Sequence, residues 1–167
     1  MLNLYVMRHS KSSWNEHNIH DFERPLSSRG RKDIKLIIAF LKKKKITFDL
    51  AYVSSSKRTK QTFKILKKDI SSKKIIYSKK FYLCSENIIL NTIRNVQKRY
   101  KNILIVNHEP CCKNLVLKLI KKNKLSFINK KFSTSAIAKL VFSIEDWENL
   151  KNYSGNLTLF KTPKDFY

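Results

Sequence analysis

Two histidines and two arginines stand at positions from which they could act together. His9 and His108 each follow a short apolar run, and Arg8 and Arg58 stand at similar points of the chain. A neutral imidazole is a competent nucleophile near neutrality, because its reference pKa is about 6.5. A guanidinium group grips an oxyanion through two parallel hydrogen bonds. These four residue types therefore indicate transfer of a phosphoryl group through a histidine.

The two histidines stand where predicted strands end. Residues 2–7 and 102–106 are almost wholly apolar, as expected for central strands that are covered on both faces. The carboxyl ends of parallel strands meet at one edge of a sheet, where functional groups of open α/β sheets gather. Arg58 follows a third predicted strand, 49–54, at the start of a helix, where unpaired backbone N–H groups favour an anion. We therefore expect all four side chains at one edge of the sheet.

Strands and helices alternate along the remaining chain. Further strands are predicted at 74–77, 133–142 and 156–161. Residues 26–30 are predicted to open a helix, with Ser27 or Ser28 as its N-cap, and the segment 55–62 leads into a second helix that carries Phe63, Leu66 and Ile70. Further helices are predicted to start at 85–86 and at Pro110, and a short helical turn is predicted at 144–150. The polar loop 11–25 is expected to lie over the end of the first strand. This order predicts one three-layer α/β domain over residues 1–167, with a largely parallel sheet of about five to six strands.

The composition restricts the class of protein. The 167 residues include 36 Lys and Arg against 12 Asp and Glu, which gives a net charge of +24. No segment has the roughly 18 apolar residues of a membrane span, and no signal peptide is visible, so we expect a cytoplasmic protein without membrane contact. The acidic residues form no cluster typical of a metal site, and we expect neither a metal nor another cofactor.

The surplus positive charge has three alternative explanations: an acidic protein partner, compositional drift, or nucleic-acid binding. The 29 lysines either attract an acidic phosphoprotein or reflect compositional drift, in which lysine has replaced arginine wherever a bare charge suffices. A basic module that binds nucleic acid is less favoured, because the lysines are dispersed and no basic–aromatic recognition motif is present. The 7 arginines are informative, since arginine is retained where a planar fork must grip an oxyanion.

The cysteines indicate packing rather than catalysis. Cys84, Cys111 and Cys112 are odd in number and lack the spacing of a metal site, which predicts reduced thiols. No arginine stands six positions after any of them, and this excludes the mechanism of cysteine-dependent phosphatases.

Four segments together resemble one protein family. Residues 7–14, 21–30, 54–62 and 106–110 read MRHSKSSW, DFERPLSSRG, SSSKRTKQT and VNHEP. In order and spacing they are similar to the motifs of SixA-type phosphohistidine phosphatases, members of the histidine phosphatase superfamily with the phosphoglycerate-mutase-like fold. Residues 132–140, Trp147 and 155–165 resemble the family's C-terminal part, so the resemblance covers nearly the whole chain.

The resemblance implies a role for each candidate residue. It implies that His9 carries the phosphoryl group and that Arg8, Arg58 and His108 bind the phosphate. It further implies that the chain removes phosphate from a histidine-phosphorylated protein, such as a phosphotransfer domain in signalling, without a metal or cofactor.

Three positions depart from the family pattern. Ser10 replaces a Gly or Ala, and its hydroxyl either binds the phosphate or is merely tolerated. Asn107 replaces a Gly, which permits backbone conformations that Asn adopts less readily. Glu109 replaces an Asn, and it either protonates the leaving oxygen of an ester as a general acid or only begins the following helix, where a carboxylate suits the dipole.

A small-molecule phosphomonoesterase of the same superfamily is the alternative function. An ester needs a general acid to expel its alkoxide, whereas a phosphohistidine releases imidazole, a better leaving group once protonated. The short chain leaves no room for an inserted lid. We therefore expect an open pocket that admits a phosphorylated side chain of another protein.

Overall fold

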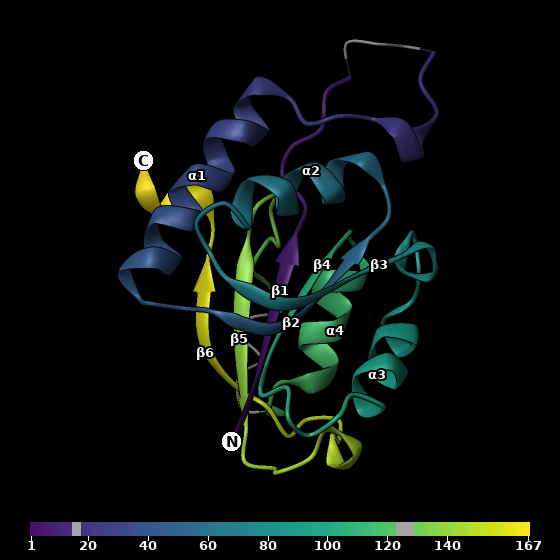
Figure 1. The fold of residues 1–167 in the computed structure, drawn as a ribbon, viewed down its shortest axis with the longest axis vertical. Helices are drawn as coiled ribbons and strands as arrows, with labels where there is room; N and C mark the ends of the chain where they lie inside the picture. Colours follow the sequence, from purple (N-terminus) through teal and green to yellow (C-terminus); the bar gives the residue numbers. More distant parts are fainter. Residues whose placement is uncertain (15–17, 123–128) are drawn as a thin grey trace.

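The computed structural model, which describes residues 1–14, 18–122 and 129–167, contains a six-stranded sheet (Figure 1). The strand order is β3-β2-β4-β1-β5-β6. The strands are β1 (Leu2–Arg8), β2 (Phe48–Ser54), β3 (Ser72–Ser78), β4 (Asn102–Asn107), β5 (Ile137–Phe142) and β6 (Asn156–Lys161). β1 to β4 run parallel, whereas β5 is antiparallel to both β1 and β6. The predicted α/β fold class with a largely parallel sheet is confirmed.

Helices cover both faces of this sheet and complete the three layers (Figure 1). They are α1 (Ser28–Lys43), α2 (Lys57–Leu66), α3 (Glu86–Arg94) and α4 (Cys111–Leu119). α1 and α2 pack on one face, and α3 and α4 pack on the other. The short 3-10 turns that matter below are η1 (Asp21–Glu23), η2 (Lys79–Phe81) and η5 (Pro163–Phe166).

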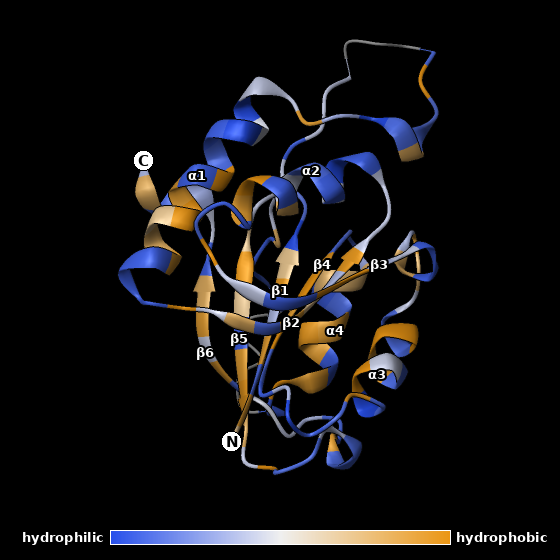
Figure 2. Cartoon of the chain, viewed as in Figure 1, coloured by the Kyte–Doolittle hydropathy of each residue, from blue (hydrophilic) through white to orange (hydrophobic). Residues whose placement is uncertain are grey.

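The sheet has a hydrophobic core on each face, and successive residues of a central strand pack into one core and then the other. Along β1, Leu4 and Val6 pack with α3 and α4, whereas Tyr5 and Met7 pack with α1 and α2. Figure 2 shows these apolar strands between helices with polar outer faces. Burial of each aliphatic side chain stabilises the fold by about 1.5–3 kcal/mol. Both cores therefore hold β1 firmly and fix the residues that follow it.

The element ends differ from the sequence-based expectations for local reasons. β5 begins at Ile137 rather than at 133, because Ser135 has a left-handed φ of 61°, which lies outside the extended region of a regular strand. α2 ends at Leu66, and Ile70 packs into the core from a turn beyond it. Of the two candidate N-caps of α1, Ser27 is the one that caps, since its Oγ accepts the N–H of Gly30 at 3.0 Å.

Candidate active site

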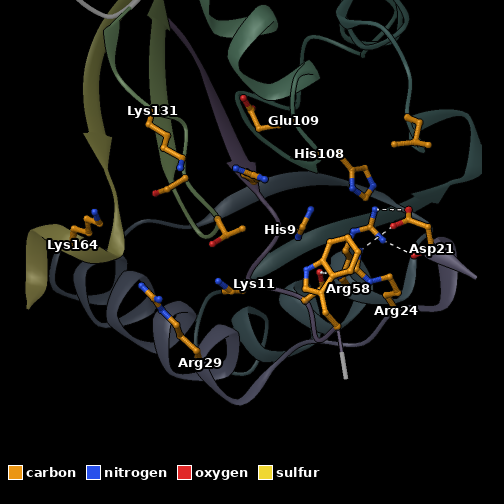
Figure 3. Close-up of a pocket in the computed structure, with 16 residues that line it drawn as sticks. His9, Lys11, Asp21, Arg24, Arg29, Arg58, His108, Glu109, Lys131 and Lys164 are labelled. Atoms are coloured by element: carbon orange, nitrogen blue, oxygen red, sulfur yellow. Dashed lines mark hydrogen bonds and ion pairs between the residues drawn. The ribbon is translucent and has the colours of Figure 1, made fainter. Parts of the chain in front are cut away.

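The carboxyl ends of β1, β2 and β4 bring the predicted residues together at one sheet edge (Figure 3). Arg8 ends β1 and His9 follows it, His108 follows β4, and Arg58 lies in the first turn of α2 directly after β2. All four line one pocket with a volume of about 810 Å³. The sheet order therefore joins residues that are up to 100 positions apart in the sequence.

His9 is held with one ring nitrogen available for attack. Its Nδ1 lies 2.7 Å from the carbonyl oxygen of Ser10, which can only accept, so Nδ1 carries the proton and donates it. Nε2 then keeps its lone pair, the state that a nucleophile needs. The backbone N–H of His9 also donates to the carbonyl of Asn107 at 2.9 Å, which ties this residue to β4.

His108 lies beside His9, with 5.0 Å between the ring centroids. Its Nε2 forms a 2.8 Å hydrogen bond with Oγ of Ser54 at the end of β2. Its ring also meets the ring of Tyr82 edge to face, 5.6 Å away. Nδ1 of His108 is buried and has no partner among the described residues, so one polar atom of the ring is left for a bound group.

Arg58 is oriented by Asp21, a residue that the sequence did not single out as functional. Nη1 of Arg58 donates to the Asp21 carbonyl at 2.6 Å, and Nη2 donates to Asp21 Oδ2 at 2.9 Å. The Tyr82 hydroxyl donates to the same carboxylate at 2.6 Å. Arg24 pairs with this carboxylate at 3.3 Å, and Figure 3 shows Asp21 beside Arg58 and Arg24. Burial raises the pKa of Asp21, but hydrogen bonds from Tyr82 and Arg58 outweigh it and lower the pKa to about 2. Asp21 is therefore charged and fixes the Arg58 fork.

The loop 11–25 lies over the end of β1, as predicted, although its residues 15–17 lie outside the described residues. Arg24 holds the loop in place: Nη2 donates to Ser12 Oγ at 2.9 Å, and the guanidinium stacks on Trp14 at 3.1 Å from the ring centroid. A Cβ at Gly30 would collide with the backbone of Lys11. The glycine therefore permits α1 to begin directly against this loop.

The side chain of Ser10 does not join the other site residues, although its carbonyl holds His9. Its side chain is fully buried, and its Oγ accepts the Ser135 hydroxyl at 2.7 Å. Its backbone N–H donates to Thr62 Oγ1 at 3.0 Å. Ser10 does not line the pocket. The structure therefore fits a hydroxyl that is merely tolerated rather than one that binds the phosphate.

Glu109 lines the pocket and also stands two residues before α4. Its Oε1 accepts the backbone N–H of Lys113 at 3.0 Å, which is the helix-start role. Burial raises the pKa of Glu109, which favours the protonated carboxyl that a general acid needs. The geometry is thus compatible with both alternatives. Asn107 causes no strain, because it is absent from the described residues with positive φ, so this turn does not require a glycine.

Both histidines are neutral near pH 7. For His9, burial is the main cause, and together with the neighbouring His108, Arg58 and Arg8 it outweighs the hydrogen bond to Ser10 and lowers the pKa well below 6.5. For His108, burial and the charge of Arg58 lower the pKa to about 3. Neutral imidazole is the nucleophilic form, so a lowered pKa keeps His9 competent into mildly acidic solution.

We expect the His9 ring to remain neutral from pH about 8 down to about 5.5, where a histidine at the reference pKa would be mostly protonated. Long-range ¹H–¹⁵N spectra, with His9 assigned by a His9→Asn variant, should show a protonated Nδ1 and a bare Nε2 throughout. A His9 titration midpoint at or above pH 6.5 would contradict this picture of the buried site.

The described residues include no cluster for a metal ion, no helix that could span a membrane and no disulfide. No three His, Cys, Asp or Glu side chains of the described ranges come together in a way that could hold a metal ion. No helix of the described chain is long and apolar enough to cross a membrane. All three cysteines are free thiols; Cys111 and Cys112 are buried, and Cys84 is half-buried.

The first half of the chain matches a known family model. Residues 4–81, which include Arg8, His9 and Arg58, match the model of the histidine phosphatase superfamily (branch 1). The predicted resemblance to this superfamily is confirmed. Two uncharacterized proteins of Mycobacterium tuberculosis, from strains CDC 1551 and H37Rv, are each 26% identical to the chain over 163 residues, 95% of this chain and 100% of theirs.

Solved structures of proteins named SixA share the fold over nearly their whole length. The protein histidine phosphatase SixA complexed with tungstate has a TM-score of 0.83 at 20% identity, over 99% of this chain and 100% of that one. The putative phosphohistidine phosphatase SixA from Agrobacterium tumefaciens has a TM-score of 0.82 at 22% identity, over 97% and 98%. The phosphoglycerate-mutase-like fold of this chain is thereby established.

Proposed function

We propose that the chain is a phosphohistidine phosphatase that removes phosphate from a histidine of another protein. The observation that supports this most is the unprotonated Nε2 of His9, a buried side chain at the base of a pocket that His108, Arg8 and Arg58 also line. The fold of the SixA phosphatases supports the same activity, and the SixA structure with tungstate supports an oxyanion in such a pocket. The cytoplasmic location and the absence of a required metal remain predictions.

The proposed reaction begins with attack of His9 Nε2 on phosphorus. The N–P bond of the substrate breaks, and its imidazole leaves after it takes up a proton from solvent. Water then attacks the phosphorus on His9, the new N–P bond breaks, and phosphate is released. Arg8 Nε and His108 Nδ1 are buried without a partner among the described residues, and such atoms cost about 1–3 kcal/mol each when unsatisfied. Phosphate oxygens would supply acceptors for both, with the Ser54 hydroxyl donating to His108 Nε2 so that Nδ1 carries the proton.

The opposite wall of the pocket favours an acidic substrate. Lys11, Arg29, Lys131 and Lys164 line it and are exposed, and Figure 3 shows Lys131, Lys164 and Arg29 across the pocket from Asp21. Within the described chain, no hydrogen bond or ion pair occupies the ammonium groups of the three lysines. We propose that they attract carboxylates around the phosphohistidine, which assigns part of the +24 charge a function.

Substrate comparison tests this function. Turnover of a phosphorylated histidine phosphotransfer domain should exceed turnover of phosphoserine peptides and alkyl phosphates, and should weaken with salt, whereas turnover of small phosphoramidate should not. The His9→Ala variant corrects for spontaneous loss of phosphate. A higher kcat/KM for the esters would overturn the proposal, and salt-independent turnover of the phosphoprotein would refute its acidic-substrate part.

A second function, hydrolysis of small phosphate esters, is favoured by the raised pKa of Glu109 in the pocket. If Glu109 protonates the leaving oxygen, Glu109→Gln should slow alkyl esters by about 10²-fold or more, yet leave phosphohistidine and nitrophenyl phosphate nearly unchanged. The amide oxygen of glutamine still accepts the Lys113 N–H, so the helix start is preserved. Equal small effects on all three substrates would assign Glu109 to the helix start alone.

A further inference from the structure

Cys84 and Cys111 face each other beside the candidate active site. Cys84 lies between η2 and α3, Cys111 is the first residue of α4, and their Sγ atoms are 3.9 Å apart. Nδ2 of Asn107, the residue before His108, donates to both sulfurs at 3.6 Å. A glycine at 107 could not make these contacts, so the residue that departs from the family pattern is the one that holds the pair.

Cys84 is the more reactive member of the pair. The hydrogen bond from the Cys111 thiol, with the Asn107 amide, outweighs burial and lowers the pKa of Cys84 to about 7. The same hydrogen bond and burial raise the pKa of Cys111. A thiolate is the form that peroxide oxidises, and Cys84 is half-buried rather than sealed from solvent.

We propose that Cys84 and Cys111 form a peroxide-sensitive dithiol whose oxidation to a disulfide lowers turnover at the neighbouring site. The Cys84 thiolate attacks one oxygen of hydrogen peroxide, the O–O bond breaks, and hydroxide leaves and takes up a proton as water. Cys111 then attacks the sulfur of the resulting sulfenic acid, an S–S bond forms, and the S–O oxygen leaves with the Cys111 proton as a second water. An added dithiol reverses the reaction.

The geometry links this disulfide to the active site. An S–S bond is about 2.05 Å long, so the two sulfurs must approach by roughly 1.9 Å. Cys84 directly follows Leu83, which lines the pocket and has a left-handed φ of 50°. Tyr82, one residue earlier, contacts Asp21 and His108. The approach therefore pulls on one wall of the pocket and shifts the two sulfurs that the Asn107 amide contacts.

Mass spectrometry tests the bond without reference to activity. After treatment with hydrogen peroxide, the chain should lose two hydrogens, and trypsin should release peptide 81–94 joined to peptide 102–113. Peptide 102–113 also contains Cys112, which is fully buried with its thiol donating to the Met7 carbonyl at 3.6 Å. The matched Cys112→Ala variant should therefore still give the joined peptides, and Cys84→Ser should not.

Phosphoramidate turnover of the same samples tests the consequence. Displacement of catalytic groups by about 1 Å can cost up to about 10²-fold, so we expect a fall of about 10-fold or more that dithiothreitol reverses. Cys84→Ser should keep its turnover in peroxide, and Cys112→Ala should lose it as the wild type does. No joined peptide, or a joined peptide with unchanged turnover, would overturn the proposal. The joined peptide does not depend on the proposed function, so the two can fail separately.

Discussion

Replacement of His9 by alanine is expected to lower kcat/KM for phosphohistidine by about 10³-fold or more, because alanine cannot accept the phosphoryl group. His108 is not placed to act as the nucleophile instead of His9. It is hydrogen-bonded to Ser54, and its ring centroid lies 5.0 Å from that of His9. Stopped-flow turnover of phosphoramidate and of a phosphoprotein would measure the loss.

Oxyanion binding supplies the control for this variant. Arg8, Arg58 and His108 remain in His9→Ala, so tungstate should still bind and should still raise the thermal unfolding temperature. Loss of turnover together with retained tungstate binding would locate the defect in chemistry rather than in folding. An active His9→Ala protein would exclude a covalent route through this residue.

Arg58→Lys is expected to lower kcat/KM by about 10²–10³-fold, the cost typical of one lost oxyanion donor. Arg58 uses Nη1 and Nη2 to bind Asp21 and keeps further N–H groups for the phosphate. A lysine offers one ammonium group and cannot reproduce this planar fork.

Arg31→Lys is the matched control for that measurement. Arg31 is exposed on α1 and does not line the active-site pocket, so the same change of residue type should leave turnover unaltered. Near-normal turnover in Arg58→Lys, with the fold intact, would show that a bare positive charge is sufficient at this position.

The fold could be predicted because each central strand is a nearly continuous run of apolar residues. β1 and β4 are buried on both faces, which requires nearly continuous apolar sequence, and both predicted runs lie within the observed strands. The ends of elements were less predictable, because they depend on single residues. Ser135 ends an extended segment through its left-handed φ, and no pattern of apolar residues reports such a conformation.

The site was predictable where chemistry and strand ends coincide. Four candidate residues line one pocket, since parallel strands deliver their ends to one edge. Asp21 was missed because its contacts with Arg58 and Tyr82 join surface segments 37 and 61 residues apart. Ser10 was expected near the phosphate because it directly follows His9, whereas the fold buries its hydroxyl against Ser135, a residue 125 positions away.

The contact between the two cysteines also could not be predicted from the sequence. Cys84 and Cys111 are 27 positions apart on separate segments, and only the fold shows that they meet. Asn107 illustrates the same limit. Its departure from glycine predicted a difficulty in the turn, whereas the structure places its amide between two sulfurs without a left-handed backbone.

Location of the phosphoryl group during turnover tests the covalent route most directly. A rapid-quench reaction with ³²P-labelled phosphoprotein, stopped in alkali and digested, should place an acid-labile label on the peptide that contains His9. The label should be absent from His9→Ala and should persist in Glu109→Gln. Full turnover of the wild type with no label on His9, or with the label on His108, would contradict the account.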